Sequence, residues 1–180
     1  MEVVDLESFE FLHFLKKING KLFVSKSVMS EMLANHYFLN RNFLSAKSIY
    51  EGILEKDSTN KSIKKKLTVC YVTTGEVVDA LRLFINQIKD DIDFVMNSDI
   101  KSDDCPCPEI ISEIENQKML FQNEIERIAA LGMLWLYCSL EKSIELFKQV
   151  EALAPDEEKY KEITLILLNK LMLNKTNSIN

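Results

Sequence analysis

Two closely spaced cysteines, Cys105 and Cys107, are the clearest candidates for chemistry in the sequence. Two thiolates this close can ligate zinc or copper, but a closed tetrahedral zinc site needs two further ligands. Neither Cys138 nor a histidine lies nearby in sequence, and thiol redox pairs usually have two residues between the sulfurs. Pro106 and Pro108 favour an extended backbone. We therefore expect a structural role and reduced thiols here, with a metal or thiol site as the alternative.

Four lysines crowd the start of one predicted helix, where positive charge is mildly unfavourable because the helix dipole is positive at that end. They are Lys61, Lys64, Lys65 and Lys66. One hypothesis is a site for an acidic peptide. The other is a solvated face balanced by Glu51 and Glu55, and we favour this second hypothesis.

The sequence has no pattern typical of a catalytic site. It contains no Gly-rich phosphate loop, no nucleophile elbow and no His-Glu-x-x-His motif, and it has only four glycines. His13 has no partner at a suitable offset, and His36 adjoins Tyr37 on an apolar helix, so we expect structural roles for both histidines. We predict no enzymatic activity and no cofactor.

Two consecutive segments, 27–60 and 61–94, repeat the same pattern of residues. In four pairs of similar residues the second member lies 34 positions after the first, as position 67 lies after position 33. The pairs are Leu33 and Leu67, Tyr37 and Tyr71, Ala46 and Ala80, and Tyr50 and Phe84. Their spacing predicts helices, and a small alanine is expected where two helices cross most closely. The period and the order of residue types resemble the tetratricopeptide-repeat family.

The resemblance implies an all-α fold, a right-handed superhelix of antiparallel helix pairs with capping helices at both ends. We expect one domain over 1–180. Beyond the two repeats it has a leading helix over 5–19, an Asp-rich Cys-Pro loop over 95–109, a long helix and third repeat over 110–156, and a capping helix over 157–173. The third repeat is indicated by Gly132, Ser143, Phe147 and Pro155, and a break near Gln117 is the alternative to one long helix.

In tetratricopeptide proteins the first helices of successive repeats line a concave groove that holds another polypeptide. The resemblance therefore implies a protein-binding adaptor whose groove is lined by Val28, Glu31, Asn35, Phe38, Leu39, Lys65, Val69, Val72 and Thr73. Members that bind chaperones grip a terminal carboxylate with a lysine and an asparagine. Here Asn35 is present but Glu31 takes the place of the lysine, so we do not expect that specificity.

Composition narrows the class of partner. The net charge of −6 disfavours direct binding to nucleic acid. The sequence has no apolar run of about 18 residues, and its start lacks the positive region followed by an apolar core that a secretory signal needs. We therefore expect a cytoplasmic protein that does not enter a membrane. The last helix has a wide apolar arc, which predicts either deep packing or a homodimer through this C-terminal helix.

A second, weaker resemblance gives an alternative function. Val4, Asp5 and Phe9, followed by two tandem repeats and a helix after a proline-bearing loop, look like the activation domain that follows a winged helix in some bacterial transcription regulators. This resemblance covers roughly residues 4–115. It implies a regulatory or oligomerisation domain in place of an adaptor.

Overall fold

The computed structural model describes residues 26–97 and 107–177, and this part of the chain is all-α. Its helices are α2 (Lys26–Leu39), α3 (Phe43–Leu54), α4 (Lys61–Thr73), α5 (Val77–Met96), α6 (Cys107–Glu115), α7 (Glu124–Trp135), α8 (Leu140–Leu153) and α9 (Glu158–Asn177). The leading helix expected over 5–19 lies outside the described residues, as does most of the loop expected over 95–109.

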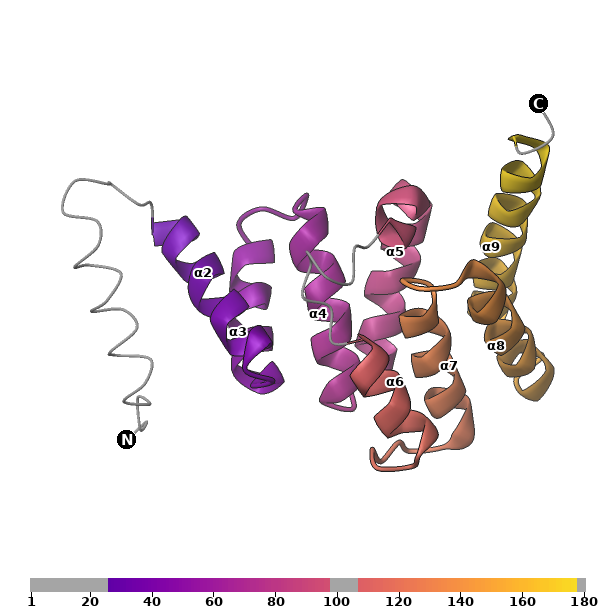
Figure 1. The fold of residues 1–180 in the computed structure, drawn as a ribbon, viewed down its shortest axis with the longest axis horizontal. Helices are drawn as coiled ribbons and strands as arrows, with labels where there is room; N and C mark the ends of the chain where they lie inside the picture. The colour runs from indigo at the N-terminus through magenta and orange to yellow at the C-terminus, as the bar shows by residue number, and fades with distance from the viewer. Residues whose placement is uncertain (1–25, 98–106, 178–180) are drawn as a thin grey trace.

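The helices form an elongated row that runs from α2 at one end to α9 at the other (Figure 1). α2 packs on α3, α3 on α4, and α4 on α5, and further along the row α7 packs on α8 and α8 on α9. Two contacts depart from this order, since α5 also meets α7 and α9. Most residues of the apolar core therefore lie between helices that are neighbours in sequence.

Polar side chains cap the starts of four helices. The side-chain oxygens of Asn42, Asn60, Asn123 and Ser139 each accept a hydrogen bond from the backbone N–H three residues later, at 2.9 to 3.2 Å. Such a bond satisfies one of the amide groups that the first helical turn leaves without a partner. These caps fix where α3, α4, α7 and α8 begin.

The small residues of the repeat pattern lie where adjacent helices meet. Ala46 and Ala80 are fully buried, as are Tyr50 and Phe84 four positions after them. Ser143, which stands at the corresponding place in α8, is also fully buried. These five positions were expected to face the core, and the burial confirms that expectation.

The single long helix expected from residue 110 is wrong, because the chain breaks between α6 and α7. α6 ends at Glu115, and Gln117 has a φ of 55°, a left-handed conformation that stops a helix. Asn123 then caps a new helix. α5 also differs from the expectation: it runs on to Met96, with an interruption at Asp91, where φ is −161° and ψ is 86°.

No helix in the described part of the chain has the length and apolar character needed to cross a lipid bilayer.

Candidate functional site

α2 carries the residues of the first repeat that were expected to line a groove. Val28 and Leu39 are exposed, while Glu31 and Asn35 are partly buried. Phe38 differs from the expectation, since it lies in the core and meets two aromatic rings of α3 edge-on. Of the five expected lining residues of α2, the other four therefore remain at or near its surface.

α4 carries the expected lining of the second repeat, and half of that lining is inside the protein. Val69 and Val72 are buried, which departs from the expected groove surface. Lys65 and Thr73 are partly buried, and the Thr73 hydroxyl donates to carbonyl oxygens of its own helix, at 2.9 Å to that of Cys70. The side of α4 that was expected to bind a partner is therefore largely closed.

α6 reaches from α7 to the turn after α2. It packs on α7, and Glu109 in its first turn accepts a hydrogen bond from Arg41, with the closest ion-pair atoms 2.8 Å apart. Its apolar residues, including Ile110 and Ile114, are buried in the same core as Val69. α6 thus adds to the core apolar side chains that the two-repeat pattern does not account for.

Three of the four clustered lysines have partners within the chain. Lys61 pairs with Asp91 at 2.9 Å, the Lys65 ammonium lies 5.0 Å from the Phe94 ring centroid, and the Lys66 ammonium donates to Asn35 Oδ1 at 2.8 Å. A lysine over an aromatic face is stabilised by the ring quadrupole. The cluster is therefore built largely into the fold, rather than being the solvated face that we favoured.

Asn35 connects three helices. Its Oδ1 atom accepts from the Tyr50 hydroxyl of α3 as well as from Lys66 of α4, both at 2.8 Å. Burial raises the pKa of Tyr50 well above its ordinary value, so the phenol stays protonated and remains a donor. The amide oxygen of Asn35 is thus used for structure, which its position on an amphipathic helix does not indicate.

Cys107, Cys70 and His36 are each used within the fold. Cys107 is buried and disulfide-bonded, so the expected reduced thiol is wrong for this residue, and Cys105 lies outside the described residues. Burial raises the pKa of the Cys70 thiol to about 12. The His36 ring accepts from the Asn40 amide at 3.0 Å. The described ranges hold no group of three or more residues able to bind a metal ion.

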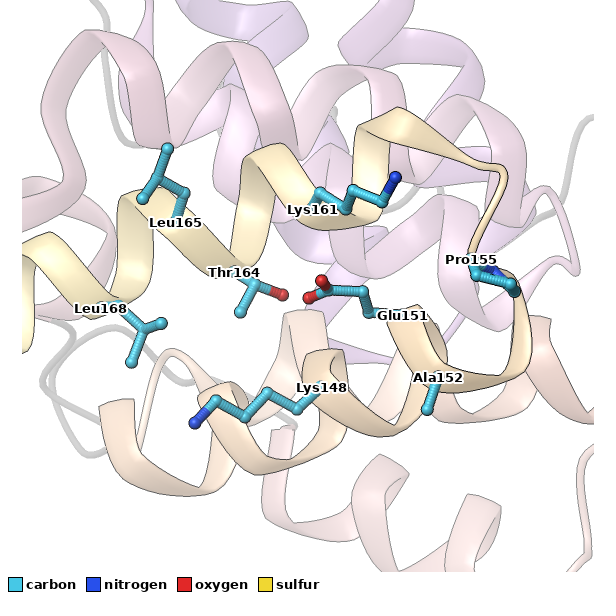
Figure 2. A pocket seen from close by; sticks show the side chains of 8 residues that line it. All are labelled: Lys148, Glu151, Ala152, Pro155, Lys161, Thr164, Leu165 and Leu168. Atoms are coloured by element: carbon cyan, nitrogen blue, oxygen red, sulfur yellow. The ribbon is translucent and has the colours of Figure 1, made fainter.

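An open groove of about 650 Å³ lies between α8 and α9 at the other end of the row (Figure 2). Lys148, Glu151 and Ala152 line it from α8, Pro155 from the connecting turn, and Lys161, Thr164, Leu165 and Leu168 from α9. Figure 2 shows Glu151 pointing toward Thr164 across the groove, with Leu168 opposite Lys148.

The wide apolar arc of the last helix indicates one wall of this groove, but no pattern in the sequence indicates the α8 wall. Lys148 and Glu151 look like an ordinary charge pair three residues apart on one helix. Only the packing of α8 against α9 places both beside exposed leucine.

Comparison with known proteins adds no relative: no family model, no curated protein and no solved structure matches this chain.

Proposed function

We propose that this chain is a non-catalytic protein-interaction module that holds a short peptide or helix of another protein. In this proposal the row of helices is a right-handed superhelix of the tetratricopeptide kind, closed by helices at its ends. The observation that carries it is an apolar stripe on α2. Val28, Met32 and Leu39 lie at positions i, i+4 and i+11 of one helix face and are 49%, 37% and 47% exposed.

An exposed apolar stripe on one helix is typical of a surface that binds another polypeptide. Asn35 lies on the same face, between Met32 and Leu39, and Glu31 borders it. The stripe is therefore apolar with polar residues beside it, which suits an amphipathic helix or an extended peptide. Met32 has the helical spacing of a buried position, and its 37% exposure departs from that expectation.

In this proposal the binding surface is shorter than the resemblance implies. Val69 and Val72 are buried in the apolar core that also holds the residues of α6, so they offer no surface to a partner, and the ion pair of Glu109 with Arg41 holds α6 near the turn after α2. What remains for a partner is the face of α2. A surface one helix long suits a short segment and not a folded domain.

The variants that test this surface must change it without changing the core. Asn35→Ala would remove the acceptor shared by Tyr50 and Lys66, and Val69→Ala would open a cavity, so neither separates binding from stability. Met32→Asp and Leu39→Asp place a charge on exposed positions. Val78→Asp is the matched control, because Val78 is 67% exposed and lies on α5.

The experiment is affinity purification from the source cell with each variant, identification of co-purified peptides, and calorimetric titration of the recovered partner. We expect Met32→Asp and Leu39→Asp each to weaken binding by at least about tenfold, as truncations of central interface residues commonly do. Val78→Asp should bind like the wild type. Equal affinity for all three variants would rule out the α2 surface.

Two other functions stay predictions. The bacterial-regulator alternative would be decided by a DNA-binding domain encoded directly upstream in the same gene product.

A thiol or metal site at Cys105 and Cys107 would require reduction first, because a disulfide sulfur is not a thiolate ligand. Native mass spectrometry of the reduced protein with added zinc tests it, and a metal-free spectrum would exclude it. The cytoplasmic location is likewise a prediction.

A further inference from the structure

The face formed by α8 and α9 carries two charges of opposite sign that have no ion-pair partner in the described part of the chain. Lys148 and Glu151 both line the groove and lie three residues apart on α8. Beside them Leu165 is 60% exposed. A surface that combines exposed apolar area with uncompensated charges of both signs can be complementary to itself.

We propose that two copies of this chain form a symmetric dimer through this face, with their α8 helices antiparallel. In such a contact each pair occurs twice: residue i of the first copy faces residue j of the second, and residue j of the first copy faces residue i of the second. If the two-fold axis crosses α8 midway between Lys148 and Glu151, Lys148 of one copy meets Glu151 of the other. The same pairing occurs on the opposite side of the axis, so both charges of both copies are compensated.

The same axis also brings apolar side chains together. Because Leu168 lies opposite Lys148 and Thr164 lies opposite Glu151, the axis crosses α9 between Leu165 and Leu168 (Figure 2). Leu165 and Leu168 of one copy then lie beside α9 of the other, on both sides of the axis. One placement of the axis therefore satisfies the charges of α8 and covers the leucines of α9.

The size of the face sets the strength of the dimer. α9 has 20 residues, or about 30 Å at 1.5 Å per residue, and two adjacent helices are about 20 Å wide. Such a face buries roughly 600 Å² on each copy, which is at the low end for a specific interface. We therefore expect a dissociation constant in the micromolar range. This dimer goes beyond the proposed function, because it uses the end of the row opposite to α2.

Charge reversal tests this geometry by sedimentation velocity at protein concentrations from about 1 to about 200 µM. The wild type should shift with concentration from the monomer mass of 20.8 kDa toward twice that mass. Lys148→Glu and Glu151→Lys each place like charges face to face, so each should weaken the dimer by at least about tenfold. An equimolar mixture of the two variants should dimerise like the wild type, because each supplies the charge that the other needs.

A second pair of variants tests the apolar part of the face. Leu165→Asp should give a monomer, whereas Val78→Asp, on an exposed position of α5, should leave the dimer intact. Circular dichroism confirms that each variant is folded. The proposal is overturned if the wild type stays monomeric throughout, for example because another part of the chain covers the groove. It is equally overturned if neither charge reversal weakens the dimer, or if the mixture fails to restore it.

Discussion

Phe147 covers Gly132 so closely that a Cβ atom on the glycine would lie 2.9 Å from the ring Cε2 atom. The ring is fully buried and stacks on Phe84, with 5.8 Å between the ring centroids. At the same crossing the Ser143 hydroxyl donates to the Gly132 carbonyl oxygen at 2.7 Å. α7 and α8 are therefore held at a distance that only glycine at position 132 allows.

Replacing this glycine should destabilise the protein. Gly132→Ala would force the helices apart, and overpacking of a core usually costs about 1 to 3 kcal/mol. The better helix propensity of alanine offsets about 1 kcal/mol of this cost, so we expect a net loss of up to about 2 kcal/mol in the free energy of unfolding. Urea denaturation measures it. Gly52→Ala is the matched control, because Gly52 lies in a helix with no atom within 4 Å of an added Cβ, and it should stabilise the protein.

The buried pair of Thr68 and Gln87 should respond unequally to the loss of each partner. Gln87 Nε2 donates to Thr68 Oγ1 at 2.8 Å, while Gln87 Oε1 is buried and has no hydrogen-bond partner among the described residues. Thr68→Val leaves the Gln87 amide without its main acceptor and should lower the free energy of unfolding by about 1 to 3 kcal/mol. Gln87→Met removes both polar groups and should change it by less than about 1 kcal/mol.

A double-mutant cycle measured by urea denaturation gives the control for this prediction. The variant with both substitutions should recover most of the stability lost in Thr68→Val, because the unpaired amide is gone. Strictly additive effects would contradict the prediction.

Glu76 should make stability depend on pH. The Lys47 ammonium donates to its carboxylate, and so does the Thr74 hydroxyl at 3.0 Å. These two hydrogen bonds hold the pKa of the Glu76 carboxyl below its ordinary value of 4.5, and the bond from Lys47 has the larger effect. The folded state thus binds this proton less tightly than the unfolded state. The contribution of ionised Glu76 to the free energy of unfolding is therefore complete above pH 4.5 and is lost as the pH falls through the lowered pKa.

We therefore expect the free energy of unfolding to fall as the pH is lowered below 4.5, and to fall less steeply in Glu76→Gln. Lys47→Met should flatten the decline in the same way, because it removes the main cause of the shift. Urea titrations at several pH values measure both slopes. Parallel curves for the wild type and Glu76→Gln would show that this carboxyl has no such role.

Two turn residues with positive φ should respond in opposite directions. Gly75 has a φ of 81° and open space around its Cα, so Gly75→Ala should lose about 1 to 2 kcal/mol through backbone strain alone. Gln117 has a φ of 55° and an exposed side chain. Gln117→Gly relieves that strain and should raise the free energy of unfolding by about 0.5 to 1 kcal/mol. Thermal or urea unfolding distinguishes these signs, and a loss in Gln117→Gly would contradict the prediction.

The sequence predicted the helices that carry the repeat pattern, because their local signals agree with their packing. Ala46 and Ala80 are fully buried as expected, and Asn60 caps α4 at the boundary expected between the two repeats. Periodicity and end caps are properties of neighbouring residues. They can be recognised without knowing which helices meet.

The candidate site was harder to predict, because it depends on contacts between residues far apart in sequence. Val69 and Val72 have the spacing of a groove surface, but they lie in the same apolar core as the residues of α6. The pairing of Arg41 with Glu109 spans 68 positions. No local pattern indicates such a contact, and the groove between α8 and α9 likewise exists only once the two helices are packed.

The contacts between α5 and α9 bear on how the protein unfolds. Lys89 pairs with Glu162 at 2.7 Å and Lys170 with Asp93 at 2.6 Å, so the last helix is joined to a helix four elements earlier. In an array where each helix touches only its neighbours, unfolding can begin at either end and spread inward. Here loss of α9 would also loosen α5, which makes the segment from α5 to α9 one cooperative unit. The α2–α3 end is joined to α6 through the exposed pair of Arg41 with Glu109, which holds it less firmly, so hydrogen exchange should be fastest at that end of the described part of the chain.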